Sequence, residues 1–409
     1  PLETNKEFVH THCPTCKKPA KRETDTMDTF FDSSWYFLRF TDPTNGKQPF
    51  EKKKADSWMP VDFYVGGAEH ACGHLIYARF FTKVLRDLGL VTCDEPFKKL
   101  FNQGMLHGED GHVMSKSRGN VINPLEVIEQ YGADTLRMFL VSVASADKDM
   151  IWSTEGIVSV HKVLQKLITL FATMTITTSS KRLESKLHQT IKEVTQYTEA
   201  IKYNLAVISL RTFIDDLGKE KTIAKHDAAA FLKLLHPFCP HITEELWEKL
   251  KNKQVITLES WPVHQEKKIN QKIDAAEKFI QATTADIANI LNLIKIKPQT
   301  ITLFIAESWK YPLFKKLHTE KTRDFSALMK KFADKEKGQD IAKIVQQFMK
   351  GALKTDIVIS LEEEADALKE QKLLLEKQFG AKIEIIHAET SKEQKAKQAI
   401  PGKVAIMVS

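Results

Sequence analysis

The chain has 409 residues, 42% hydrophobic and 28% charged, a composition typical of a globular protein with roughly two to four domains. Without a run of about 18 apolar residues or a basic–apolar leader, it is expected to have neither a membrane span nor an export signal. Five cysteines favour a reducing, cytoplasmic location over a disulfide framework, and the net charge of +7 is compatible with a polyanionic partner. Because the first residue is proline rather than methionine, we expect the chain to begin at a fragment boundary.

Residues 1–24 contain two cysteines, Cys13 and Cys16, separated by two residues. Such a pair is half of a four-ligand zinc site, and the sequence has no second Cys-x-x-Cys. His10 and His12 lie close by in the sequence but are unconvincing as the other two ligands. Cys13 and Cys16 are therefore candidate ligands of a structural Zn²⁺ whose remaining ligands lie outside the chain. The alternative is a reduced turn.

Residues 25–40 alternate acidic, hydroxyl and aromatic side chains. This mixture suits a pocket wall in which a few polar groups orient an apolar ligand. The alternative is an aromatic core with a capping turn.

A strand, a glycine turn and a helix follow one another from residue 61. The run 61–65 predicts a buried strand that Gly66 and Gly67 break, and the apolar spacing over 71–88 predicts a helix. Residues 100–105 would form the next parallel strand. This order is typical of a doubly wound sheet, which binds nucleotides at the carboxyl ends of its strands.

The segment 104–120 predicts a mobile, cationic loop. Ser115, Lys116 and Ser117 lie between glycines, and small hydroxyls beside a flexible ammonium group suit the binding of phosphate. Asn123 then marks the start of a helix. The alternative is a solvated surface loop.

The rest of the chain is mainly helical. The spacing predicts helices over 124–145, a bundle over 157–250 and a long helix over 266–294. Strands with lysine-rich helices between them complete a small α/β module, and they are expected at 300–306, 356–359, 382–386 and 404–408.

Three blocks carry a family resemblance. The run VMSKS at 113–117 resembles the KMSKS signature of class I aminoacyl-tRNA synthetases. The blocks TDTMDTFFDSSWY at 24–36 and VGGAEHACGH at 65–74 resemble the leucyl enzymes in particular, and all three occur in that family's order. Val113 departs from the signature, because a lysine is usual there. The resemblance is strong over about 8–160, fair to about 262 and weaker beyond.

The resemblance implies an α/β fold with a partial Rossmann-type parallel-sheet catalytic domain, followed by a helical bundle and a small α/β domain. We expect the tail of an upstream insertion over 1–24 and the C-terminal half of the catalytic domain over 25–156. A helical anticodon-binding-like domain would occupy 157–262. A long helix with a tRNA-interacting α/β domain would occupy 263–409.

The resemblance also implies leucine–tRNA ligation from leucine, ATP with Mg²⁺, and tRNA-Leu. Lys116 would meet the pyrophosphate, with Ser115 and Ser117 bonding phosphate or fixing the loop. The expected ATP-binding residues are Gly66, Gly67, Glu69, His70, Gln103, Gly104, Met114 and Lys116. The expected leucine pocket consists of Phe30, Ser33, Tyr36, His70 and His74. Because His70 and His74 are four residues apart, a metal site with Cys72 is an alternative for them.

Neither a HIGH-type signature nor an editing domain is found, and in the family both lie upstream. We therefore expect one part of a split or truncated enzyme that needs its N-terminal half and does not form leucyl-adenylate alone. Two alternatives remain open: a class I synthetase for isoleucine, valine or methionine, and a non-catalytic tRNA-binding scaffold.

Overall fold

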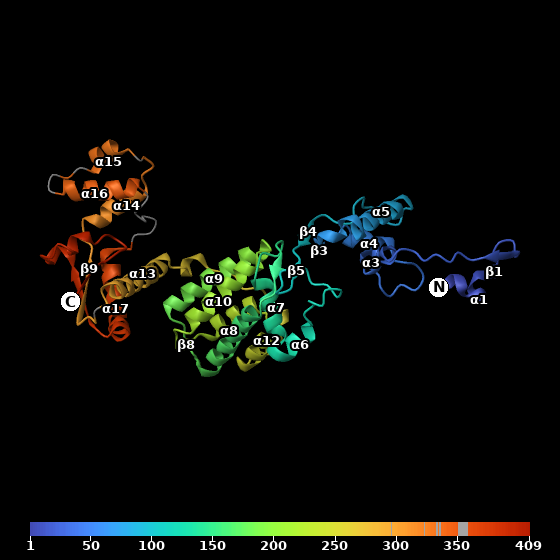
Figure 1. The fold of residues 1–409 in the computed structure, drawn as a ribbon, viewed down its shortest axis with the longest axis horizontal. Helices are drawn as coiled ribbons and strands as arrows, with labels where there is room; N and C mark the ends of the chain where they lie inside the picture. Colours follow the sequence, from blue (N-terminus) through green and yellow to red (C-terminus); the bar gives the residue numbers. More distant parts are fainter. Residues whose placement is uncertain (296, 323, 333, 335–336, 351–358) are drawn as a thin grey trace. The chain divides into compact units, whose positions relative to one another are not determined.

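The computed structural model describes all residues of the chain except 296, 323, 333, 335–336 and 351–358. The chain divides into two compact units (Figure 1). The first contains Pro1–Ser179 and Thr190–His264, and the second contains Ser180–Gln189 and Gln265–Ser409. Every helix in the described part of the chain is too short or too polar to span a lipid bilayer.

The first unit begins with short elements. They are α1 (Lys6–Val9), the antiparallel strands β1 (His10–His12) and β2 (Pro19–Lys21), α2 (Phe30–Ser33), α3 (Tyr36–Arg39) and α4 (Lys52–Trp58). Helices α2 and α3 form where the sequence mixes hydroxyls with aromatics. Phe37, Leu38 and Ala55 from this region are buried in one apolar cluster with Ala78 and Val91.

A parallel pair of strands follows, β3 (Tyr64–Gly67) and β4 (Leu100–Gln103). Tyr64 lies opposite Leu100, and Gly67 lies opposite Gln103. The glycines therefore belong to the strand, and the prediction that they break it is wrong, because pairing with β4 continues through both. The predicted helix begins later than expected, at His74, as α5 (His74–Asp87). A 3-10 helix, η2 (Ala68–Cys72), precedes it.

Strands β5 (Leu106–His107) and β6 (Met150–Ile151) form a second parallel pair. The chain between them contains the loop and two helices, α6 (Pro124–Tyr131) and α7 (Ala133–Ser142). The predicted helical region 124–145 contains these two helices, which are separated at Gly132, whose φ of 87° is in the left-handed region that glycine tolerates. The parallel pairs and the α/β order confirm the predicted fold class.

The predicted bundle is present. It contains α8 (Thr154–Thr173), α9 (Lys181–Glu199), α10 (Tyr203–Leu217), α11 (Lys225–Leu235) and α12 (Pro240–Lys249), with the two-residue strands β7 (Thr175–Ile176) and β8 (Thr222–Ile223). The rings of Phe213 and Phe231 lie 4.7 Å apart between α10 and α11, and both are buried. Asp134 of α7 accepts a hydrogen bond from the backbone N–H of Ile242, in the first turn of α12, at 2.6 Å. Such a bond satisfies a donor that a helix start leaves free.

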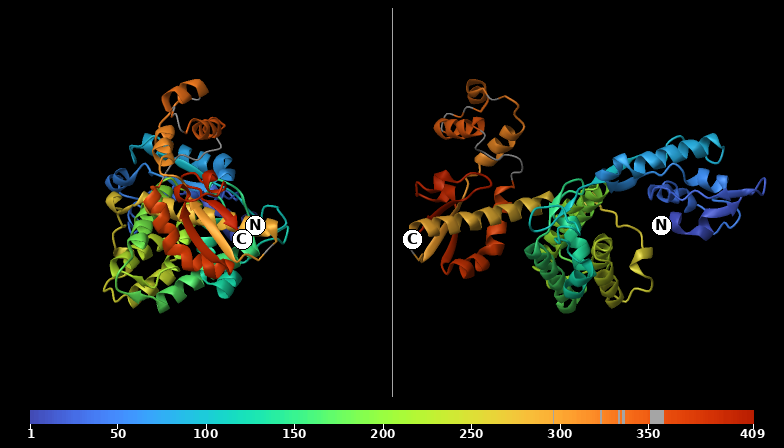
Figure 2. Two further views of the ribbon diagram at one scale, coloured as in Figure 1. Left: turned by 90° about the vertical axis from the view of Figure 1, so that its left-hand side faces the viewer. Right: turned by 45° about the vertical axis from the view of Figure 1, so that its right-hand side comes forward.

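The second unit is an α/β module. It contains α13 (Gln271–Ile294), β9 (Thr300–Ile305), α14 (Lys310–His318), α15 (Phe325–Phe332), α16 (Gly338–Met349), α17 (Leu361–Phe379), β10 (Lys382–His387) and β11 (Ala405–Val408). The sheet has the order β10-β9-β11, with β10 parallel and β11 antiparallel to β9. Helices α13 and α17 share its core, and Figures 1 and 2 show them beside the strands, in gold to red. Three of the four predicted strands are confirmed; residues 356–358 of the fourth lie outside the described residues.

Candidate functional site

A cavity of about 390 Å³ lies against strands β3 and β4 in the first unit. Nine of the residues expected at the site line it: Phe30, Ser33, Tyr36, Gly66, Gly67, Glu69, His70, His74 and Gln103. The other lining residues are Tyr64, Val65, Leu75 and Leu100. Segments more than 60 residues apart in sequence therefore meet in one place, because α2, α3 and α5 all reach the β3–β4 pair.

Three polar side chains of this cavity form a chain of hydrogen bonds. The hydroxyl oxygens of Tyr36 and Tyr64 lie 2.7 Å apart, and the Tyr64 hydroxyl lies 2.7 Å from His74 Nε2. The Tyr64 ring stacks on Phe97, with centroids 3.8 Å apart. Stacking and two hydrogen bonds hold Tyr64 in one orientation, so it fixes the positions of Tyr36 and His74. Tyr64 was not among the predicted site residues, because its place in the strand after Phe63 carries no local signal for this role.

His74 is buried at the start of α5, and its Nδ1 has no hydrogen-bond partner among the described residues. Burial, with the nearby His70 ring, lowers the pKa of His74. The imidazole is therefore neutral near pH 7, which suits a pocket for an uncharged side chain.

The side chains of Phe30 and His70 form another side of the cavity. Their ring centroids lie 6.1 Å apart at an interplanar angle of 84°, an edge-to-face arrangement. Gly73 allows this approach, since a Cβ there would lie 3.0 Å from Phe30 Cε2. The two rings therefore give this side of the cavity an aromatic surface.

The carboxylate of Glu69 folds back over Gly67. A Cβ built on Gly67 would lie 2.1 Å from Glu69 Oε2, so the bare glycine makes room for this carboxylate. Glu69 Oε1 lies 3.9 Å from His70 Nε2. The side chain of Glu69 is about half exposed and is available to accept hydrogen bonds from a bound hydroxyl.

The loop between β5 and α6 is held at its base by Asn120. The backbone N–H of Ser115 donates to Asn120 Oδ1 at 2.9 Å, and the Asn120 amide donates to both oxygens of Asp110 at 3.2 Å. The backbone N–H of Met114 donates to the carbonyl of Leu106 at 3.2 Å. Asn120 and Asp110 were missed by the sequence analysis, because their pairing depends on the folded turn.

The tip of the loop presents its cation to solvent. Lys116 is exposed, and no described carboxylate lies within ion-pair distance of it. The hydroxyls of Ser115 and Ser117 lie 3.2 Å apart, on either side of Lys116. Gly111 and Gly119 both have φ near 70°, as the turns at the ends of this segment require. Ser115, Lys116, Ser117 and Met114 are not among the residues that line the cavity.

Gly104 and His107 contact the segment that precedes β6, and so connect the start of the loop to it. A Cβ on Gly104 would lie 2.0 Å from the carbonyl oxygen of Lys148, so only glycine fits there. His107 Nδ1 lies 2.9 Å from the carbonyl oxygen of Gly111, and its Nε2 lies 3.3 Å from Asp149 Oδ2. His107 and Asp149 therefore position the start of the loop, a role with no signal in the sequence.

Cys13 and Cys16 lie in the turn between β1 and β2. Hydrogen bonds from the backbone N–H groups of Cys16 and Thr15 lower the pKa of the Cys13 thiol. Among the described residues no group of three or more metal-binding side chains exists, around these cysteines or around His70 and His74. Two thiols do not complete a four-ligand zinc site.

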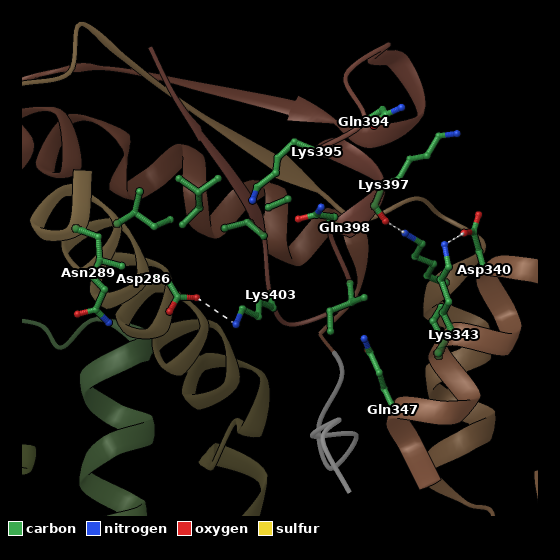
Figure 3. Close-up of a pocket in the computed structure, with 18 residues that line it drawn as sticks. Asp286, Asn289, Asp340, Lys343, Gln347, Gln394, Lys395, Lys397, Gln398 and Lys403 are labelled. Carbon is green, nitrogen blue, oxygen red and sulfur yellow. Dashed lines mark hydrogen bonds and ion pairs between the residues drawn. The ribbon is translucent and has the colours of Figure 1, made fainter. Parts of the chain in front are cut away.

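A larger cavity, of about 970 Å³, lies in the second unit, far from these residues in sequence. Figure 3 shows its polar lining, with Lys403 paired to Asp286 and Lys343 to Asp340. Five lysines and two aspartates line it, so the cavity carries a net positive charge. The lysines are Lys310, Lys343, Lys395, Lys397 and Lys403.

Comparisons with known proteins identify the family of the chain. Residues 3–153 match the family model for class I tRNA synthetases (I, L, M and V), and residues 180–303 match the model for the anticodon-binding domain of tRNA ligase. The chain therefore belongs to the class I aminoacyl-tRNA synthetases.

Within this class, the relatives are leucine–tRNA ligases. That of Thermosipho melanesiensis is 41% identical over 69% of this chain and 36% of its own length. That of Halobacterium salinarum is 32% identical over the whole of this chain and 48% of its own length. The LeuRS of Agrobacterium radiobacter K84, solved as a ternary complex with tRNA and LeuAMS, superposes with a TM-score of 0.60 at 30% identity, over 75% of this chain and 39% of that one.

Within this class, the chain therefore belongs to the leucyl-tRNA synthetase family. It spans between 36% and 48% of the length of the curated relatives named here.

Proposed function

We propose that the chain supplies part of the site at which a leucine–tRNA ligase activates leucine with ATP and transfers it to tRNA-Leu in the cytoplasm. The single observation that carries this proposal is the cavity against β3 and β4. It combines an aromatic wall, a neutral histidine and a half-exposed carboxylate beside two consecutive glycines.

The apolar part of the cavity suits the leucine side chain. Phe30, Tyr36 and His74 would surround it, with hydrogen bonds joining the Tyr36 hydroxyl, the Tyr64 hydroxyl and His74 Nε2. A leucine pocket of this type gains about 0.8 kcal/mol for each buried methylene. Ser33 and His70 complete the lining.

The adenosine would lie along the other side of the cavity. Gly66 and Gly67 allow its close approach, and Glu69 would accept a hydrogen bond from a ribose hydroxyl. Gln103 lies at the end of β4, and Gly104 and Met114 would lie near the adenine as the chain enters the loop.

Lys116 would act on the triphosphate of ATP, which binds as its magnesium complex. Formation of the adenylate joins the leucine carboxylate oxygen to the α-phosphorus and releases pyrophosphate. The exposed ammonium, on a segment bounded by Gly111 and Gly119, would stabilise the negative charge that develops on the leaving group. Ser115 and Ser117 would donate hydrogen bonds to the same phosphates. Val113 provides no second cation there.

The activity would need a further segment of polypeptide, because the relatives are longer than this chain. We define the complementary segment as the part of a relative's leucine–tRNA ligase that precedes its match to this chain. It would be present either in the same protein chain or as a separate subunit.

Transfer RNA would contact the second unit. Lys395 and Lys397 of the larger cavity are exposed and have no carboxylate within ion-pair distance among the described residues, so they would provide positive charge for a phosphate backbone. The tRNA-interacting role that the family resemblance implies for this module favours the same assignment. The helical bundle would contact the tRNA body.

The test is amino-acid-dependent exchange of pyrophosphate into ATP, measured with leucine, isoleucine, valine and methionine. We expect no exchange with the chain alone, and leucine-dependent exchange once the complementary segment is present. Exchange that prefers another of the four amino acids would contradict the leucine assignment. Salt-dependent tRNA binding with no exchange under any condition would instead favour a non-catalytic scaffold.

A further inference from the structure

The connection between β10 and β11 forms one side of the larger cavity in the second unit. It runs from residue 388 to residue 404, contains only two short 3-10 helices and is here called the basic segment. Three of its lysines line the cavity, and Figure 3 shows their side chains: Lys395, Lys397 and Lys403. Because most connections between strands are much shorter, a segment of this length is expected to have a function.

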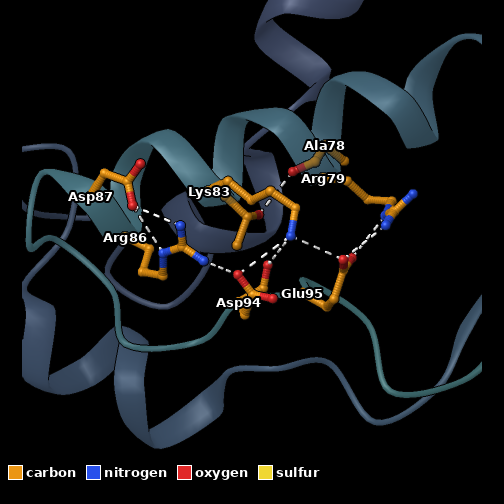
Figure 4. A network of polar contacts seen from close by, with 8 residues as sticks. Ala78, Arg79, Lys83, Arg86, Asp87, Asp94 and Glu95 are labelled. Atoms are coloured by element: carbon orange, nitrogen blue, oxygen red, sulfur yellow. Dashed lines mark hydrogen bonds and ion pairs between the residues drawn. The ribbon is translucent and has the colours of Figure 1, made fainter.

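Two lysines of the basic segment have no ionic partner. Lys395 and Lys397 are exposed, and among the described residues no carboxylate lies within ion-pair distance of either. The cations on α5 differ, because Arg79 and Lys83 are both paired with Glu95, as Figure 4 shows. A nucleic acid is bound by cations that are free to replace the counterions of its phosphates. Lys395 and Lys397 meet this requirement, and the cations of α5 do not.

A buried lysine holds the backbone of the basic segment. Lys310, the first residue of α14, is 2% exposed, and its Nζ donates to the carbonyl oxygens of Lys397 and Ala399, each at 2.9 Å. Glu307 Oε2 lies 3.1 Å from the same Nζ and balances its charge. An ammonium group has three donors, so all three are used inside the protein. Lys310 is therefore not available to a ligand, and its contacts fix the backbone that carries Lys397.

A buried carboxylate holds the end of the same segment. Glu364 of α17 is 0% exposed, and its Oε1 accepts a hydrogen bond from the N–H of Gly402 at 2.6 Å. Its Oε2 accepts from the hydroxyl of Tyr311 at 2.7 Å. Because Tyr311 follows Lys310 in the sequence, both contacts with the basic segment involve the first turn of α14. The backbone of the segment is therefore held at two places by buried charged side chains.

Apolar packing contributes to holding the segment, but it is not the whole of the contact. Ala396 and Ala399 are both 0% exposed and belong to one cluster with Phe304. Burial of a charged side chain costs free energy unless its hydrogen bonds are complete. A complete buried network makes a structure rigid and specifies one conformation. The two buried charges therefore favour one backbone position of the basic segment, which packing of small side chains alone would not define.

We propose that Lys310 and Glu364 are positioning residues, which hold the basic segment so that Lys395 and Lys397 contact phosphates of the tRNA backbone. The inference rests on the proposed function, because its partner is tRNA. It assigns to Lys310 and Glu364 an effect on binding although neither touches the tRNA. A merely stabilising role would change the folded fraction of the protein and leave the tRNA contacts of the folded chain unaltered.

The experiment is the salt dependence of tRNA binding by the full chain. The probes are tRNA-Leu transcripts of Thermosipho melanesiensis, Thermotoga maritima and Halobacterium salinarum. Each lysine that contacts a phosphate contributes about one unit to the slope of the logarithm of affinity against that of salt concentration. The joint variant Lys395→Ala/Lys397→Ala should therefore lower the slope by about two. Lys310→Met should lower it by about one to two, although both exposed lysines are still present.

Two variants separate positioning from an effect of net charge. Lys310→Met removes a cation and Glu364→Leu removes a carboxyl group, so a simple charge effect would change the slope in opposite directions. Positioning predicts that both variants lower it. Glu364→Gln keeps a carbonyl oxygen for the Gly402 N–H and should retain the native slope.

Combined substitutions and a control complete the series. Adding Lys310→Met to the two alanine substitutions should lower the slope no further, since the three lysines act through one set of contacts. Lys369→Met, at an exposed lysine that pairs with Asp366 on α17, is the control and should leave the slope unchanged. Hydrogen exchange at residues 391–403 should become faster in Lys310→Met and remain native in Lys369→Met.

Far-UV circular dichroism of each variant shows whether its helices still fold. A variant that has lost helix is replaced by Tyr311→Phe, which removes one of the two hydrogen bonds to Glu364 and should lower the slope in the same direction.

Each outcome decides the proposal. An unchanged slope in the folded Lys310→Met or Glu364→Leu variant overturns it, and so does a further fall in the combined variant. Absence of tRNA binding by the native chain with all three transcripts also overturns it. Leucine-dependent pyrophosphate exchange with the complementary segment is measured separately. Exchange with unchanged slopes keeps the proposed activation of leucine and removes this inference, and lowered slopes without exchange do the reverse.

Discussion

Helices α10 and α5 have similar apolar spacing, but their apolar side chains differ in how far they are buried. On α10, Phe213 and Ile214 are 1% and 0% exposed, whereas on α5 Ile76 and Phe80 are 56% and 65% exposed. The apolar face of α10 packs against neighbouring helices of the same chain, among them α7 and α8. The comparison teaches that an amphipathic pattern locates an apolar face but does not say which segment covers it.

The largest expected effect tests this contrast directly. Phe231→Ala removes a fully buried ring that packs on Phe213, and should lower the free energy of unfolding by about 3–5 kcal/mol. Phe80→Ala removes an exposed ring and should cost less than about 0.5 kcal/mol in the chain alone. Urea unfolding followed by circular dichroism measures both. Similar losses of unfolding free energy in the two variants would contradict the difference in burial between α10 and α5.

A second test compares a buried and an exposed carboxylate on α17. Glu364 is buried, and burial raises its pKa to about 7, although the Tyr311 hydroxyl and the Gly402 N–H donate to it and act in the opposite direction. Between pH 4.5 and 7 the folded state therefore binds more protons than the unfolded state. The stability that this group contributes is full below pH 4.5 and is lost as the pH rises through 7, by up to about 3 kcal/mol.

In Glu364→Gln this part of the pH dependence should disappear. Glu362→Gln, at an exposed position on the same helix, serves as the control and should leave it unchanged. Thermal unfolding from pH 5 to pH 8 measures the difference. An unchanged pH profile in Glu364→Gln would show that the buried carboxylate does not titrate in this range.

A smaller effect is expected for a hydroxyl inside the cavity. Tyr64→Phe removes the group that joins Tyr36 to His74 and should cost about 1–2 kcal/mol, because the partly buried Tyr36 and the buried His74 each lose a hydrogen bond. Tyr77→Phe, at an exposed position on α5, should cost less than about 0.5 kcal/mol. Equal costs, measured by urea unfolding, would mean that the Tyr64 hydroxyl bonds are not formed in solution.

Local patterns predicted much of the fold. Apolar spacing and helix caps located the bundle and α13, and Asn123 does cap α6 by accepting from the N–H of Leu125 at 3.1 Å. The strands β9, β10 and β11 followed from runs of β-branched and aliphatic residues. In each case the physical cause lies within a few residues of the element itself.

Features that depend on distant residues were missed. Gly66 and Gly67 resemble a turn locally, but pairing with β4 extends the strand through them. Tyr64 has two partners, 28 and 10 residues away in sequence. Asp134 caps α12 from more than 100 residues away. Nonlocal contacts of this kind leave no periodic signal in one sequence.

The most direct measurement for the account as a whole is leucine-dependent pyrophosphate exchange by Lys116→Ala in the presence of the complementary segment, with tRNA binding measured on the same sample. The account predicts that exchange falls by about 10²–10³ while tRNA affinity is unchanged, because one preorganised donor to the developing charge is lost. Lys148→Ala, at another exposed lysine, should leave both unchanged. Undiminished exchange in Lys116→Ala would contradict the assignment of the loop to the leaving pyrophosphate.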